Sequence, residues 1–460
     1  MNPVCVDQVG ARPPAGGHTR RRHLALGAGG VAAAALGACG PGAPAGTPES
    51  RTAAPVKVTM VLHNSNAQRI YERHFPEFKE KHPHVDAQWV LTSTIAGTES
   101  NEAKMATLIV AGTPPDIFIP WMQPGGGFLA RGWAAPIDAT AIGFKSVSQV
   151  LDQYAWREAL DIAKWKGKYY GLPTEISNYC LYINNRMFRK AGLDPQRDYP
   201  RDWDQMLEVA RKLTVREGSQ ITQRGFELDY TRPQLHWAGH AYQLMGPFLT
   251  DDGKVNVNNE GAARTLQYWA DWGQKHQLGS PKLPVPGNTF YEETLAMWAS
   301  GSWYAPGVKT RNEALFNDLT VKPFPRWKDK KYDHGTHVYG YAMLVSSQVP
   351  KDVQAAAWRV AWFFSSYPVE HLAAGGLFQP KKDFVESAAF KTFKDIPSMD
   401  VFLDDMKKST YVMKTPAFDP VTQVLKEQFP KAWTEGQPAK QLLPDVQREL
   451  ERVVREAGAK

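Results

Sequence analysis

The segment GKYYGLPTEISNYCLYINNRMFRKAGL (167–193) contains a strand and helix pattern that recurs along most of this 460-residue chain. Lys168–Leu172 and Tyr179–Ile183 are short runs typical of strands, and Asn185–Lys190 has the character of a helix start. Short strands that alternate with helices are typical of α/β proteins with a mainly parallel sheet. The segment therefore predicts an α/β fold.

The same alternation begins upstream, at Val56. The β-branched and apolar patterns predict strands at Val56–Leu62, Val85–Leu91 and Asp116–Ile119. Helices are expected between them, at Ala67–Lys81 and Glu99–Ala111. The order strand, helix, strand, helix, strand is that of consecutive βαβ units.

Downstream of the opening segment, Asp202–Leu213 predicts a helix with Asp202 as its N-cap. Gly335–Ser346 has the pattern of a strand. Further helices are expected at Glu260–Gln274, Glu292–Ser300, Ala355–Ser365 and Val421–Trp433. From Val56 onward the chain has about 400 residues, a length that favours two domains.

The N-terminal residues have the order of an export signal. Thr19–Leu24 reads TRRRHL, a twin-arginine pattern, and the uncharged apolar run Leu24–Ala38 follows it. The run is shorter than the roughly 20 residues that a membrane span needs. It ends in LGAC (36–39), which resembles a bacterial lipobox, so we expect cleavage after residue 38 and lipid on Cys39. An ordinary signal peptide followed by a chance Cys, or a fortuitous Ala/Gly tract, is the alternative.

The segment after Cys39 indicates how the chain is held. Residues 39–55 have almost no large apolar side chain and predict a linker between the lipid and the globular part. Cys5 would leave with the signal and Cys39 would carry lipid, so Cys180 has no partner for a disulfide. We therefore expect an exported protein anchored to the extracytoplasmic face of the cell membrane.

The charge of the chain excludes one class of partner. The formal net charge is +7, and four of the Arg residues and one Asp lie in 1–38, before the predicted cleavage site. The sequence has no block of five or six like charges of the kind that marks a nucleic-acid-binding tail. We expect no nucleic-acid partner.

Several segments are similar to the extracytoplasmic solute-binding proteins of ATP-binding-cassette importers, in their large sugar-binding group. Gly167–Leu193 is the most specific of them, and in Phe78–Val90 the family pattern has Val where this chain has Ala87. The other segments follow in family order and are Met105–Ile119, Gly132–Asp138, Asp202–Leu213, Ala296–Tyr304, Pro323–Trp327, Ala356–Ser366 and Gly375–Asp383.

This resemblance implies a monomer of two α/β lobes that binds its ligand in the cleft between them and delivers it to a membrane permease. Clefts between domains, beyond the carboxyl ends of strands, are common ligand sites. The implied lobes comprise residues 56–178 with 319–378, and 179–318 with 379–460. The implied crossings between the lobes lie near Asn178–Leu181, Asp318–Val321 and Leu377–Pro380.

A sugar has apolar faces on which aromatic rings stack, and hydroxyl groups that bind carboxylates and amides. Asn64, Ser65 and Trp121 follow predicted strands, although an Asn-Ser pair also caps helices. The resemblance adds residues near the crossings and at the position of a stacking aromatic. The candidates are Asn64, Ser65, Trp121, Glu175, Tyr179, Trp237, Trp303, Tyr304, Tyr339 and Gly340. The alternative for Glu175 is a surface salt bridge, and core or lobe packing is expected for Trp156, Trp165, Trp203, Trp269, Trp358 and Trp362.

Other functions are less favoured by the motifs. The sequence has no GxSxG, HExxH or P-loop motif, so we expect no enzyme and no cofactor. The pairs His82/His84 and His334/His337 are expected at the surface or in the core, without metal. Aromatic and amide candidates favour a carbohydrate over a glycerophosphate-like anion, which would need clustered Arg or Lys. A surface enzyme that acts on carbohydrate and an adhesive lipoprotein stay as alternatives.

Overall fold

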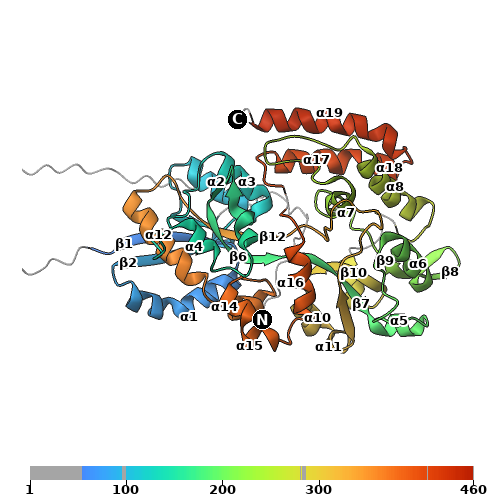
Figure 1. Ribbon diagram of the computed structural model, residues 1–460, viewed down its shortest axis with the longest axis horizontal. Coiled ribbons are helices and arrows are strands. Elements are labelled where there is room, and N and C mark those ends of the chain that lie inside the picture. Colours follow the sequence, from blue (N-terminus) through green and yellow to red (C-terminus); the bar gives the residue numbers. More distant parts are fainter. Residues whose placement is uncertain (1–53, 96–99, 280, 282–285, 412, 459–460) are drawn as a thin grey trace, which may run out of the picture. The chain divides into compact units, whose positions relative to one another are not determined.

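A computed structural model describes residues 54–95, 100–279, 281, 286–411 and 413–458, and it contains two five-stranded sheets with helices around each (Figure 1). The fold is α/β with two lobes, as the sequence predicts. The expected export signal, Cys39 and most of the expected linker lie outside the described residues.

The first lobe is built on a sheet with the strand order β2-β1-β3-β12-β6. The strands are β1 (Val56–Leu62), β2 (Val85–Leu91), β3 (Ile117–Phe118), β6 (Gly171–Ser177) and β12 (Tyr339–Val345). Strands β2, β1 and β3 are parallel, whereas β12 runs antiparallel to both of its neighbours, so the sheet is mixed. The helices of this lobe are α1 (Ser65–Lys81), α2 (Asn101–Val110), α3 (Met122–Ala130), α4 (Val147–Leu151), α12 (Lys351–Phe364) and α13 (Pro368–Gly375).

The second lobe has the strand order β11-β7-β10-β9-β8. Its strands are β7 (Tyr179–Asn184), β8 (Val215–Glu217), β9 (Gln220–Phe226), β10 (Leu295–Gly301) and β11 (Leu319–Lys322). Of the neighbouring pairs only β9 and β10 are parallel, so the expectation of a mainly parallel sheet is wrong for this lobe. Its helices are α5 (Asn185–Lys190), α6 (Trp203–Leu213), α7 (His236–Met245), α8 (Glu260–Gln274), α9 (Pro286–Tyr291), α10 (Tyr304–Arg311), α11 (Glu313–Phe316), α17 (Phe418–Gln428), α18 (Pro430–Trp433) and α19 (Ala439–Gly458).

One predicted helix is a strand. Residues 292–300 were expected to be helical, but Leu295–Gly301 forms β10, which lies between β7 and β9 and is buried along its whole length. A strand with both faces buried has no alternation of apolar and polar residues, so its apolar run does not differ from that of a buried helix.

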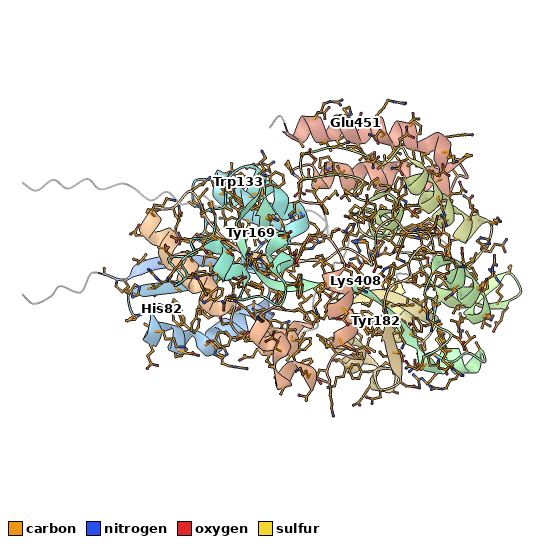
Figure 2. All side chains as sticks on the ribbon, in the orientation of Figure 1. His82, Trp133, Tyr169, Tyr182, Lys408 and Glu451 are labelled. Atoms are coloured by element: carbon orange, nitrogen blue, oxygen red, sulfur yellow. The ribbon has the colours of Figure 1, made fainter. Side chains whose placement is uncertain are left out.

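The core of the second lobe shows why its helices form where they do. Asp202 accepts a hydrogen bond from the Gln205 N–H and caps α6, as predicted. Trp203 and Met206 on α6 are almost completely buried and belong to the same core cluster as Trp269 on α8. Burying a Trp of this kind stabilises the fold by about 3–5 kcal/mol relative to Ala. Tyr182 on β7, labelled in Figure 2, is also fully buried, but it belongs to a different core cluster, with Phe118 and Cys180.

The lobes are joined by extended segments that lie side by side. Asn178 separates β6 of the first sheet from β7 of the second, which agrees with the first expected crossing. The Thr336 hydroxyl accepts from the Tyr179 N–H and donates to the Tyr179 carbonyl, at 2.9 and 3.0 Å. The Val338 N–H donates to the Thr410 carbonyl at 2.9 Å, which adds a third segment.

The second and third crossings differ from the expected positions. Strand β11 pairs with β7, so residues 319–322 belong to the second sheet and not to the first lobe. The return to the first sheet lies between Lys322 and Tyr339. Phe378 still pairs with Ile176 of the first lobe. The chain then continues through α14 (Lys382–Glu386), α15 (Ala388–Lys391) and α16 (Met399–Lys407) to Thr410.

A buried charged cluster ties the loop after β1 to the rest of the first lobe. The Glu175 carboxylate on β6 lies 2.8 Å from His63 Nε2 and 3.4 Å from His371 Nδ1 on α13. Burial favours the protonated carboxyl, but the charge of His63 and hydrogen bonds from both imidazoles outweigh it and hold the pKa of Glu175 well below its usual range. The cluster therefore fixes His63, the residue before Asn64.

We expect Glu175→Gln to destabilise the protein by about 3–5 kcal/mol at pH 7, because it removes one partner from a buried charged cluster. A carboxylate with a lowered folded-state pKa stabilises the fold above its unfolded pKa and loses this contribution as the pH falls. The difference in unfolding free energy between the two proteins should thus shrink below about pH 4. Urea denaturation of both proteins at several pH values measures this difference in unfolding free energy.

Glu370→Gln is the control, because Glu370 pairs with Arg73 and His74 at the surface of the same lobe. This substitution should lower the free energy of unfolding by less than about 1 kcal/mol. Equal effects of the two substitutions would contradict a special role of Glu175.

Candidate functional site

Three aromatic side chains converge where the lobes meet. Trp303, which follows β10, is 37% exposed, more than almost any other large apolar side chain of the described residues. Tyr339 begins β12, and its ring centroid lies 5.1 Å from that of Tyr179 at the start of β7. A methyl group added to Gly301 would lie 2.3 Å from the Tyr339 hydroxyl and 2.5 Å from Trp303 Nε1. Both side chains therefore point to the end of β10.

The backbone around Trp303, which follows a strand of the second lobe, is held by residues of the first lobe. The Ser302 hydroxyl donates to the Gly376 carbonyl, and Ser177 Oγ lies 2.9 Å from Ser302 Oγ. Gly376 ends α13 with a φ of +70°, and a side chain there would meet the Trp303 Cα at 2.7 Å. Glycine is needed for this conformation and this close approach. Trp303 is thus presented from a rigid position.

Charged groups of the second lobe lie beside the aromatic residues. Asp229, just after β9, lies 3.2 Å from His236 Nε2 and 3.5 Å from Arg232 Nε. Burial alone would raise the pKa of Asp229. His236 and Arg232 lower it by more, so the pKa of Asp229 lies well below its usual range. The His236 ring contacts the Tyr179 ring at 4.7 Å. These groups offer hydrogen bonds next to apolar rings.

The first lobe contributes a second set of aromatic and acidic groups. Trp121 follows β3, and its half-buried ring lies edge-on to Phe418 of α17, with centroids 5.7 Å apart. The Trp121 N–H donates to Glu102 on α2 at 2.9 Å. That hydrogen bond and the nearby His63 both lower the pKa of the Glu102 carboxyl. Burial has the larger effect, so the pKa is raised overall. Trp121 also forms an isolated β-bridge with Tyr341, two residues after Tyr339.

Several predicted site residues have structural positions instead. Asn64 caps α1 by accepting from the Ala67 N–H, the alternative that the sequence left open, and Ser65 beside it is exposed. Trp237 and Tyr304 are buried in the hydrophobic cores, against their expected role in ligand contact.

Glu175 and Gly340 also have structural positions. Glu175 is only 2% exposed and belongs to the cluster with His63 and His371. Gly340 allows β12 to approach β6, because a side chain there would lie 1.9 Å from the Glu175 carbonyl oxygen. Of the ten predicted residues, Tyr179, Trp303 and Tyr339 thus remain together, and Trp121 lies on the first lobe beside Tyr341.

Sequence reasoning missed the charged members of this group. Asp229, Arg232 and His236 follow β9, whose short sequence QITQRGF has a weak apolar pattern, so no strand was expected there. Glu102 lies in the first turn of an expected helix, and no motif in the sequence marked it as a site residue. The stretch LDYTRPQ after a strand could have identified Asp229 and Arg232.

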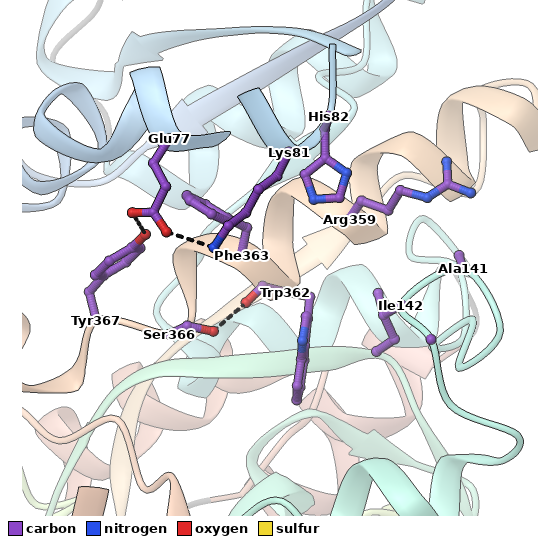
Figure 3. Close-up of a pocket in the computed structure, with 11 residues that line it drawn as sticks. Glu77, Lys81, His82, Ala141, Ile142, Arg359, Trp362, Phe363, Ser366 and Tyr367 are labelled. Atoms are coloured by element: carbon purple, nitrogen blue, oxygen red, sulfur yellow. Dashed lines mark hydrogen bonds and ion pairs between the residues drawn. The ribbon is translucent and has the colours of Figure 1, made fainter. Parts of the chain in front are cut away.

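A hollow without any of these residues lies on the first lobe, between α1, residues 141–143 and α12 (Figure 3). It has a volume of about 580 Å³, and several of its polar side chains pair with one another. Glu77 accepts from Lys81 at 2.7 Å and from the Tyr367 hydroxyl at 2.9 Å. It contains none of the predicted site residues.

No group of three or more His, Cys, Asp or Glu side chains in the described part of the chain is arranged to hold a metal ion. His334 and His337 are buried, with ring centroids 5.1 Å apart, and they pack around Tyr242. Within the same residues, no helix has both the length and the apolar character to span a bilayer.

The comparisons with known proteins agree with this arrangement. A family model for bacterial extracellular solute-binding proteins matches residues 64–367. The arabinooligosaccharide-binding protein of Bacillus subtilis is 21% identical over 310 residues, which cover 64% of this chain and 65% of that protein. The chain is therefore aligned with just under two thirds of the length of this relative.

Solved structures share the fold at low identity. The cyclic α-maltosyl-1,6-maltose binding protein of Arthrobacter globiformis is 18% identical, with a TM-score of 0.71 over 87% of this chain and 100% of that chain. UgpB of Mycobacterium tuberculosis, in complex with glycerophosphocholine, is 14% identical, with a TM-score of 0.69 over 88% of this chain and 99% of that one. With a family match over most of its length and this two-lobe fold, the chain belongs to the bacterial extracellular solute-binding proteins.

Proposed function

We propose that this protein captures a carbohydrate between its two lobes, without chemical turnover, and delivers it to the membrane permease of an ATP-binding-cassette importer. The observation that carries the proposal is the convergence of Trp303, Tyr339 and Tyr179 at the junction of the lobes. Aromatic faces with a few polar groups at their edges are suited to a ligand with apolar faces and hydroxyl groups. The similarity to an arabinooligosaccharide-binding protein supports the same ligand class.

The charges near these rings favour a neutral ligand. Arg232 and His236 both lie within 3.5 Å of the Asp229 carboxylate, so an acid already faces them. Glu102 adds a carboxylate on the other lobe. A phosphate-bearing ligand would need more cationic than acidic side chains around it, because phosphate is bound by charge-assisted hydrogen bonds from Arg and Lys. The glycerophosphate-like alternative, represented among the similar folds, is therefore less favoured by the residues at this site.

We also propose that Cys39 carries lipid after export through a twin-arginine signal, and that residues 40–55 form a flexible spacer. A capture protein held beside its permease works at a higher effective concentration than one that diffuses freely.

Trp303→Ala should weaken sugar binding at least tenfold, because it removes an aromatic surface from the ligand site while the fold stays intact. Isothermal titration with the best ligand of a sugar library measures the change. Trp133→Ala is the matched control, since Trp133 is also partly exposed to solvent but lies on the first lobe against Phe128. An unchanged affinity in Trp303→Ala, or an equal loss in both variants, would contradict the assigned role.

Cys39→Ala should move the protein from the membrane fraction to the soluble extracytoplasmic fraction, because it removes the thiol that would carry the lipid. Fractionation followed by immunoblotting detects this change, and Cys180→Ala is the control because Cys180 is buried in the core. Retention of Cys39→Ala in the membrane fraction would rule out this anchor.

A further inference from the structure

Two adjoining hollows on the first lobe form an elongated surface, which we call the α12 groove. The hollow of Figure 3, of about 580 Å³, and a smaller one of about 290 Å³ are both lined by Trp362 and Ser366, at the end of α12. Neither hollow contains a residue of the candidate site. An elongated groove suits an extended segment of chain better than a compact ligand.

Aromatic side chains and an unpaired cation line the α12 groove. Trp362 and Tyr367 are partly exposed there. The Arg359 guanidinium also lines the groove, and it forms no hydrogen bond or ion pair with the described residues. Asp138 interacts with Arg359 electrostatically, but its carboxylate accepts hydrogen bonds from Thr140 and from the backbone. Arg359 is therefore available to a carboxylate from another segment.

The α12 groove lies next to the point where the chain enters the first lobe. The Val56 N–H, at the start of β1, donates to the His84 carbonyl at 2.8 Å. The Val85 N–H donates to the His82 carbonyl at 3.0 Å, and His82 lines the groove. The segment that precedes Val56 therefore joins the lobe within a few residues of the groove wall.

This preceding segment has the composition that an aromatic groove binds. Pro41 and Pro44 form a P-x-x-P pattern, and Pro48 follows them. Proline-rich segments favour an extended helix and lose little entropy when they dock on aromatic side chains. Glu49 is the only acid between residues 39 and 55. It precedes Val56 by seven residues, which reach up to about 25 Å when extended.

We infer that residues 44–51 of this chain dock in the α12 groove, with Glu49 on Arg359 and the prolines against Trp362 and Tyr367. Charge complementarity and the place where the segment joins the lobe select this occupant over a second protein. The docking itself does not need a lipid on Cys39.

The consequence for the tether rests on the proposed anchor at Cys39. Undocked, residues 40–55 would span about 22 Å on average between the lipid and the first lobe. With residues 44–51 docked, only residues 40–43 stay free, and they would span about 11 Å. Docking would thus hold the first lobe closer to the membrane.

A tethered segment needs little intrinsic affinity for its groove. The effective concentration of a segment on a short flexible link is on the order of 1 mM. A segment with an intrinsic Kd of about 0.1 mM would therefore be docked about ten times as often as it is free.

Cleavage by an arginine-specific protease tests the docking in the full chain from residue 39, with Cys39→Ser so that no lipid is needed. Arg51 is the only Arg between residues 39 and 68, so release of residues 39–51, followed by mass spectrometry, reports cleavage there. We expect this cleavage to be at least tenfold slower than in a synthetic peptide of residues 44–56. Arg359→Glu should raise the rate to within about threefold of that of the peptide, without a change in melting temperature.

An exchange of charges tests the contact itself. Glu49→Lys should also accelerate cleavage, and its combination with Arg359→Glu should restore protection, because the two side chains attract each other again. Arg264→Glu is the matched control. Arg264 lies on a helix of the second lobe over the Trp327 ring, beside a hollow of about 500 Å³, and its replacement should leave cleavage after Arg51 unchanged.

Three results would overturn the docking. They are cleavage of the wild-type chain as fast as that of the peptide, equal effects of Arg359→Glu and Arg264→Glu, and no restored protection in the combined variant. Protection that appears only with vesicles of anionic phospholipid would instead assign the α12 groove to the bilayer surface. Failure of the proposed anchor or of sugar capture is detected separately, by fractionation of Cys39→Ala and by sugar titration.

Discussion

The arrangement of both lobes depends on a few hydrogen bonds between extended segments at the hinge. The Thr336 hydroxyl binds both backbone groups of Tyr179, and Val338 binds the Thr410 carbonyl. These bonds hold together the extended segments that connect the two sheets. A link made of a few extended residues is also the kind of connection about which lobes rotate when they close on a ligand.

The candidate site follows from this constraint. Tyr179 and Tyr339 lie at the first positions of the strands that leave the hinge, so their rings meet there. Trp303 is held next to them because Ser302 bonds to Ser177 and to Gly376. The polar groups around the rings are paired with one another, as in Asp229 with His236. The site therefore combines rigid apolar surface with polar groups at its edge, as the proposed carbohydrate ligand would require.

The fold was predictable wherever a local pattern coincided with a surface element. Helix α8 occupies the expected residues 260–274, because one face of it is buried and the other is solvated. The error at β10 has the opposite cause. This strand is buried on both faces, so its sequence shows no alternation of apolar and polar residues. The positions of the second and third crossings were also wrong, because they depend on which sheet β11 and Phe378 join. Sheet membership is a long-range property.

By itself, the sequence determined the α/β class, the order of most elements, and the placement of aromatic and polar residues after strands. These depend on local periodicity, capping and turns, which neighbouring residues specify. Only the tertiary structure decided which aromatic residues face the junction. Trp303 and Trp237 were both expected to contact the ligand, but Trp237 packs against Phe248 and Phe429 while Trp303 stays partly exposed. Whether a side chain is buried depends on residues distant in the chain, so local sequence could not distinguish them.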